Sequence, residues 1–105
     1  MRQFTPSELD AHLRSGGEPV LLDVREPWEY ELARLPGAHL LPMGEIMNRM
    51  AELDPAAETV VICHHGVRSR QVGHLLESRG FTNIINLRGG VDAWANEVDG
   101  GMPRY

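Results

Sequence analysis

Two short, largely apolar runs, Val20–Leu22 and Thr59–Ile62, most constrain the fold of this chain. A strand with one face in water alternates apolar and polar residues, whereas a strand covered on both faces is apolar throughout. Strands of the second kind occur mainly in parallel sheets that carry helices on both faces. Because helical patterns separate the two runs, the sequence predicts an α/β fold with a mostly parallel sheet and right-handed crossovers.

Helix signals surround these runs. Thr5 is a predicted N-cap, with Pro6 at the first helical position and Glu8 completing a capping box. The same reasoning predicts further helices at 26–32, 43–53, 68–78 and 89–98, and short strands at 39–41 and 81–86.

The predicted helix at 43–53 is rich in methionine. Met43, Met47 and Met50 recur at helical spacing with Ile46 and Leu53, and Asp54-Pro55 stops the pattern. We interpret these methionines as core residues rather than as ligands.

Length and charge exclude several classes of function. The 105 residues fit one domain, 1–105, with a single core. A formal net charge of −5 gives no general attraction to nucleic acid or to an acidic membrane, and no apolar run approaches the roughly 20 residues that span a bilayer. A single cysteine excludes an internal disulfide, and the first residues open no signal peptide, so we expect a reduced, cytoplasmic protein. The absence of lysine excludes Schiff-base chemistry.

The single cysteine, Cys63, stands where the second apolar run gives way to a polar, glycine-containing turn and then to a helical pattern. A strand, a tight turn and a helix start aim backbone N–H groups and a helix dipole at one point, which favours an anion there. Such a field favours the thiolate, the reactive form of cysteine. The alternative is an inert core residue, but the polar residues that follow argue against it.

The residues after Cys63 are candidates for holding an anion. We expect Gly66 to adopt a positive φ or to allow close backbone approach, and Ser69 to cap or to donate into the loop. Arg68 lies close enough along the chain to bind an anion through its guanidinium, although it could also be a solvated arginine at the helix start. His64 and His65 are expected to contribute backbone N–H groups, with side chains that tune the local field.

Two other constellations are given structural interpretations. His64 and His65 suggest zinc, but consecutive residues cannot readily supply three tetrahedral ligands and there is no second cysteine, so we predict no metal.

Asp23 and Arg25 could reach the site from a neighbouring strand end. A buried structural pair is the better interpretation of them.

Four motifs in order along nearly the whole chain resemble landmarks of the rhodanese family. They are Leu22–Glu26 through Tyr30, the Leu35–Ala38 turn leading to Pro42, the Cys63 loop, and Leu87–Gly90 with Trp94. The resemblance implies a rhodanese-like fold with a central, mostly parallel five-stranded sheet and helices on both faces. One departure is Arg34-Leu35, where the family often has histidine and isoleucine.

The resemblance also implies an activity. Cys63 would take a sulfane sulfur from thiosulfate or a similar small anion as a persulfide, and would pass it to cyanide, a thiol or a protein thiol. Residues 64–69, which include Val67, would form the active-site loop that binds the substrate. No cofactor is implied.

Two rival functions remain. A cysteine phosphatase or arsenate reductase also uses a thiolate in an anion cradle, but such phosphatases place arginine six positions after the cysteine, where this chain has Ser69. A sulfur-carrier or protein-binding module is the other rival, and the intact Cys63 argues against an inert form of it.

Overall fold

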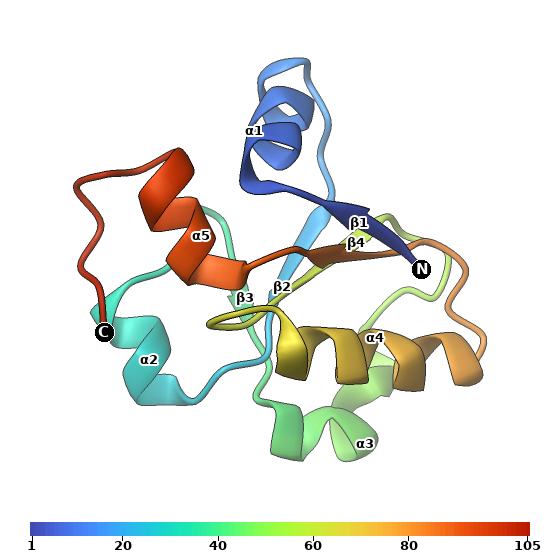
Figure 1. Ribbon diagram of the computed structural model, residues 1–105. Coiled ribbons are helices and arrows are strands. Elements are labelled where there is room, and N and C mark those ends of the chain that lie inside the picture. Colours follow the sequence, from blue (N-terminus) through green and yellow to red (C-terminus); the bar gives the residue numbers. More distant parts are fainter.

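The computed structural model describes residues 1–105 and contains one five-stranded sheet in which every pairing is parallel. The strand order is β1-β5-β4-β2-β3, so β4 lies at the centre (Figure 1). The strands are β1 (Arg2–Phe4), β2 (Val20–Asp23), β3 (His39–Leu40), β4 (Thr59–Ile62) and β5 (Ile84–Leu87). The expected α/β fold with a five-stranded sheet is therefore confirmed.

Helices cover both faces of the sheet. They are α1 (Pro6–Arg14), α2 (Pro27–Leu32), α3 (Ile46–Arg49), α4 (Val67–Ser78) and α5 (Gly90–Glu97). The core on one face joins α1 and α5 to Val60 and Ile62 of β4, while the core on the other face joins α3 and α4 to Val61. Successive residues of a strand point to opposite faces, and this is why β4 is buried throughout. None of the helices is long and apolar enough to cross a membrane.

The register of the sheet places the carboxyl ends of neighbouring strands together. Asp23 at the end of β2 pairs with Ile62 at the end of β4, and Val61 pairs with Asn86 of β5. In parallel sheets this edge is where ligands bind. The segments that follow Asp23, Ile62 and Leu87 therefore leave the sheet at one edge.

The N-terminus of α1 forms as its sequence predicts. The Thr5 side chain accepts a hydrogen bond from the Glu8 backbone N–H at 3.1 Å, and the Glu8 carboxylate accepts one from the Thr5 N–H at 2.9 Å. Such a capping box satisfies two of the amides that a helix start leaves unpaired.

The prediction of one regular helix at 43–53 is wrong. The segment consists of a 3₁₀ turn, η1 (Met43–Glu45), the short α3, and a second 3₁₀ turn, η2 (Met50–Glu52). Because a 3₁₀ turn has three residues per turn instead of 3.6, the apolar residues of this segment do not all lie on one face. Ile46 is completely buried and Met50 is partly buried, but Met47 is 54% exposed, so the methionines are not uniformly core residues.

Strand β1 was not predicted from the local pattern. Its three residues, Arg2–Phe4, are mostly exposed and include no apolar run, and they form a strand at the sheet edge by pairing with β5. The expected five strands came from the family resemblance rather than from this segment.

The burial difference within α3 can be tested. We expect Ile46→Ala to lower the free energy of unfolding by roughly 2–5 kcal/mol, because it opens a cavity under a fully buried side chain. The neighbouring change Met47→Ala should stay within about 0.5 kcal/mol of the wild type. Urea unfolding monitored by circular dichroism measures both, and equal losses would contradict the assignment of Ile46 as the buried contact of α3.

Candidate active site

Cys63 follows directly on β4 and is 1% exposed. Its Sγ accepts a hydrogen bond from the Gly66 N–H at 3.0 Å, and its thiol donates to Ser69 Oγ at 3.3 Å. Both partners come from the chain that curls from the end of β4 into α4. The sulfur therefore sits inside a closed loop, residues 63–69, in contact with neutral dipoles.

Gly66 makes this loop possible. It has a φ of 94° and is the N-cap of α4. A Cβ at this position would lie 3.1 Å from the backbone nitrogen of Gly89, in addition to the strain of a positive φ. The prediction that Gly66 has a positive φ and allows close approach is confirmed.

The start of α5 holds the loop from the other side. The Val91 N–H donates to the Cys63 carbonyl at 2.8 Å, and the Asp92 N–H donates to the His64 carbonyl at 3.0 Å. A Cβ on Gly90 would lie 2.3 Å from the Cys63 carbonyl oxygen, so only glycine fits there. The first amides of a helix lack partners within it, and here two of them are used to fix the cysteine backbone.

Ser69 and Asn86 continue the hydrogen-bond chain away from the sulfur. Ser69, which is fully buried, donates its hydroxyl proton to Asn86 Oδ1 and so leaves its oxygen free to accept from the Cys63 thiol. The Asn86 side-chain amide in turn donates to the Gly66 carbonyl at 3.4 Å. Asn86 of β5 thus binds the loop at its middle, Gly66, and at its helical end, Ser69.

Arg68 is paired with a carboxylate. Its two terminal nitrogens donate to Glu29 of α2 at 2.7 and 2.9 Å, and the Glu29 side chain is 4% exposed. The hydrogen bonds from Arg68 lower the pKa of Glu29 to about 2, and the same contact raises the pKa of Arg68. The Arg68 guanidinium, which was expected to bind a substrate anion, is therefore already bound to a carboxylate of the same chain.

Tyr105 connects this pair to a second ion pair. Its hydroxyl donates to Glu29 Oε2 at 2.7 Å and accepts from Arg25 at 2.8 Å, while Arg25 also pairs with Asp23 at 2.7 Å. Burial, followed by the Glu29 contact, raises the pKa of Tyr105 to about 12, which keeps the hydroxyl proton in place at neutral pH. Asp23 and Arg25 are both fully buried, as the structural interpretation of this pair predicted.

The two loop histidines stack. The His64 ring lies 3.9 Å from the Tyr105 ring centroid and 4.0 Å from that of His65. Burial, and then the neighbouring His65, lower the pKa of His64. The ligand atoms of His64, His65 and Asp92 lie within 4.8 Å of one another and could hold a divalent ion. Arg104 already binds Asp92 at 2.8 Å, however, and its positive charge opposes a cation there.

The structure brings together all the loop residues that the sequence singled out, 63–69. Glu29, Asn86 and Tyr105 were missed. Nothing in the local sequence marks them, because each meets its partner across 17 to 76 positions of the chain.

Comparison with known proteins defines the family. The family model for the rhodanese-like domain matches residues 5–97, and the chain belongs to this family. A crystal structure of a rhodanese-like domain protein from Staphylococcus aureus superposes with a TM-score of 0.86 at 30% identity, covering 100% of this chain and 99% of that one.

Curated relatives differ in length and name. A protein named sulfurtransferase from Allochromatium vinosum is 33% identical over 103 residues, which are 98% of this chain and 94% of the relative. A putative sulfur carrier protein, YrkF, from Bacillus subtilis is 38% identical over 79 residues, 75% of this chain and 43% of the relative. The chain spans only 31% and 26% of the length of two other curated relatives that it matches.

The lowered pKa of Glu29 predicts a specific pH dependence of stability. A carboxylate whose folded-state pKa lies below its unfolded value stabilises the protein above the unfolded pKa, and this contribution is lost as the pH falls through the folded pKa. For Glu29 that window runs from about pH 5 to pH 2, and a shift of this size corresponds to up to about 3 kcal/mol. We expect Glu29→Gln to unfold at lower urea concentration at pH 7 and to lose part of the wild-type dependence on pH in this window.

The matched control is Glu31→Gln, an exposed glutamate on the same helix. It should retain the wild-type pH dependence. If Glu29→Gln kept the wild-type curve as well, Glu29 would not be held as the buried ionised partner of Arg68.

Proposed function

We propose that this protein is a sulfurtransferase in which Cys63 carries a sulfane sulfur as a persulfide. The observation that carries the proposal is the closed loop around Sγ, in which the Gly66 amide already donates to the sulfur. Relatives named sulfurtransferase and sulfur carrier support the same chemistry. Because the reaction needs a reduced thiol, we also propose a cytoplasmic location.

In the donor step, the Cys63 thiolate attacks the outer sulfur of thiosulfate or of a similar donor. A bond forms between Sγ and that sulfur, and the sulfur–sulfur bond of the donor breaks, so that sulfite leaves with the bonding electrons. The thiol proton is released beforehand to solvent. Loop amides such as Gly66 N–H then stabilise the negative charge on the enzyme-bound sulfur.

In the acceptor step, cyanide or a thiolate attacks the outer sulfur of the persulfide. A bond forms between the acceptor and this sulfur, the Sγ–S bond breaks, and the Cys63 thiolate is regenerated with the electron pair. No redox cofactor is needed, because each attacking nucleophile supplies the electron pair of the new bond and each leaving group keeps the pair of the broken one. Since Cys63 is 1% exposed, loop residues must shift locally to admit donor and acceptor.

Phosphoryl or arsenate chemistry fits this site less well. A phosphatase needs a free guanidinium for the transferred oxyanion, whereas both terminal nitrogens of Arg68 are bound to Glu29. The spacing also argues against a phosphatase, because Arg68 is the fifth residue after Cys63 and not the sixth.

A sulfur-carrier role is the second candidate, and the Bacillus subtilis relative of that name favours it. A carrier would form the same persulfide but would release sulfur rapidly only to a protein partner. Turnover with cyanide separates the two, because an enzyme produces thiocyanate repeatedly and a carrier is discharged slowly.

Replacement of the nucleophile is the direct test. We expect Cys63→Ser to fold but to form no thiocyanate from thiosulfate and cyanide, because a hydroxyl cannot carry sulfane sulfur. Intact-protein mass spectrometry should show a gain of one sulfur atom on the wild type after thiosulfate, and cyanide should remove it. A folded Cys63→Ser protein with substantial activity would refute Cys63 as the nucleophile.

A further inference from the structure

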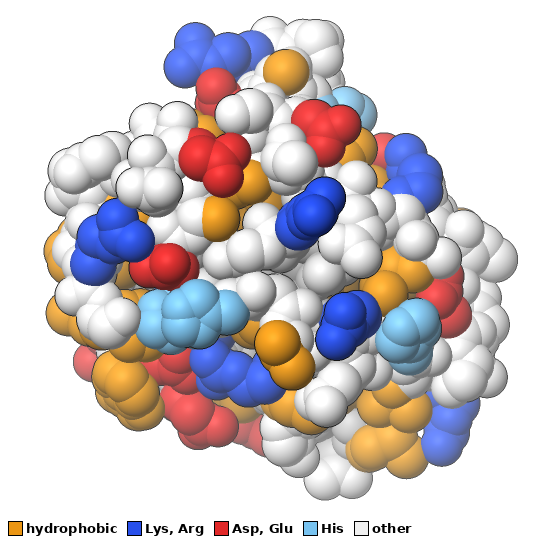
Figure 2. Space-filling view, viewed as in Figure 1, with side chains coloured by type: hydrophobic (Ala, Val, Ile, Leu, Met, Phe, Trp, Pro, Cys, Tyr) orange, Lys and Arg blue, Asp and Glu red, His pale blue; other side chains and the backbone are white.

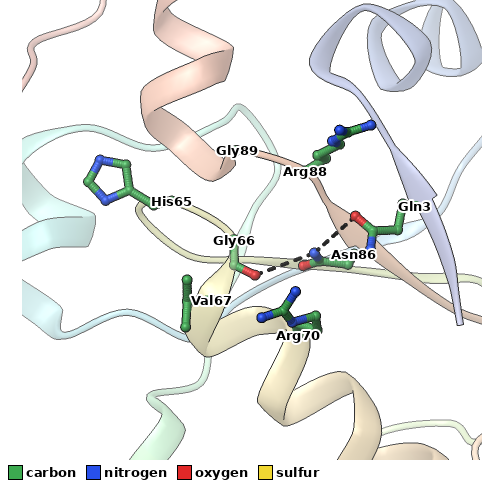
Figure 3. Close-up of a pocket in the computed structure, with 8 residues that line it drawn as sticks. All are labelled: Gln3, His65, Gly66, Val67, Arg70, Asn86, Arg88 and Gly89. Carbon is green, nitrogen blue, oxygen red and sulfur yellow. Dashed lines mark hydrogen bonds between the residues drawn. The ribbon is translucent and has the colours of Figure 1, made fainter.

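A cavity of about 420 Å³ opens beside the catalytic loop, between the first turn of α4 and the turn that joins β5 to α5. Arg70 and Arg88 line it from these two elements, and Gln3 of β1 and Asn86 of β5 add side-chain amides (Figure 3). Val67 is its only hydrophobic lining residue. The lining is therefore polar, and it contains no carboxylate.

The two arginines are electrostatically unpaired. Six of the ten arginines lie within 4.0 Å of a carboxylate, and Arg34, Arg70, Arg79 and Arg88 do not. Of these four, Arg70 and Arg88 line the cavity. Glu8 is near enough to be affected by Arg88, but its carboxylate is held by the Thr5 amide. On this face of the molecule, separate arginine side chains are divided by uncharged surface (Figure 2). Two cations are thus left facing one cavity without a counterion.

The cavity shares a wall with the site of the thiol. Gly66 lines it and donates to Cys63 Sγ, and Asn86 lines it and binds Ser69, the other partner of the thiol. Arg68, the residue expected from the sequence to hold an anion, is instead neutralised by Glu29. The free positive charge beside the loop therefore lies on Arg70 and Arg88.

We propose that this cavity binds the oxyanion groups of a small organic sulfur compound, with Arg70 and Arg88 as the residues that recognise its carboxylates or phosphates. The proposal rests on the proposed function. Arginine binds both kinds of oxyanion through its planar fork. The volume falls in the range of about 300–1,000 Å³ that is typical of sites for organic ligands, and thiosulfate alone would leave most of it to water. The bound compound acts as the thiol acceptor, or as the corresponding persulfide donor.

The kinetic test compares two acceptors with the wild type and three variants. Glutathione carries two carboxylates, and 2-mercaptoethanol is an uncharged thiol. We expect Arg70→Gln and Arg88→Gln each to raise KM for glutathione about tenfold with little change in kcat, and to leave KM for 2-mercaptoethanol unchanged. Arg79→Gln, which removes an exposed arginine outside the cavity, should leave both values unchanged. Equal KM values for glutathione in all four proteins would overturn the proposal.

A binding test does not depend on sulfur transfer. Calorimetry of Cys63→Ser protein with S-methylglutathione, which has no free thiol, should show binding that is weakened about tenfold by Arg70→Gln and Arg88→Gln, but not by Arg79→Gln. Binding of this kind with no sulfur transfer by the wild type would support the cavity and refute the proposed function. Sulfur transfer by the wild type without such binding would refute the cavity and leave the function intact. Because both arginines are exposed, the variants should unfold at the wild-type temperature.

Discussion

The hydrogen bonds from the start of α5 to the carbonyls of Cys63 and His64 are the constraint on which the site depends. They fix the backbone of the nucleophile to a helix that is itself buried through Val91 and Trp94. Because the Cys63 backbone is held in this way, the loop can curl back so that the Gly66 N–H donates to the Cys63 sulfur. This arrangement requires glycine at 66 and 90, because the backbones of the loop and of the α5 start lie too close together for a side chain.

A chain of polar contacts locks the opposite side of the loop. It runs from Asp23 through Arg25, the neutral Tyr105 and Glu29 to Arg68, so each carboxylate is paired with one arginine. Breaking one member would leave a buried charge uncompensated, which costs far more than the pair contributes. These residues hold Arg68 at the first turn of α4, where the helix dipole alone would disfavour a cation. Their arrangement stabilises the loop and leaves little net charge for a substrate to meet.

Local patterns predicted the parts of the structure that depend on local physics. The unbroken apolar runs gave β2 and β4, the capping box gave the start of α1, and the strand–turn–helix pattern gave the Cys63 loop with a positive φ at Gly66. Long-range contacts were not predictable in this way. Strand β1 exists because it pairs with β5, and Glu29, Asn86 and Tyr105 acquire their roles only when distant segments meet. At 43–53 the apolar spacing suited a regular helix, but only Ile46 is fully buried there.

The electrostatics of the site divide into two kinds of interaction. Around the sulfur itself the partners are neutral dipoles: the Gly66 N–H donates to Sγ, and the Ser69 hydroxyl oxygen accepts from the thiol. In the proposed mechanism the Gly66 amide stabilises the negative charge on sulfur without adding a formal charge to the loop. Formal charges lie farther out, where Glu29 neutralises Arg68 and no carboxylate lies within 4.0 Å of Arg70 or Arg88. In the proposed reaction, the neutral Gly66 donor at the sulfur, with Arg70 and Arg88 in the adjacent cavity, would let a compound be held by its charged end while the sulfur remains transferable.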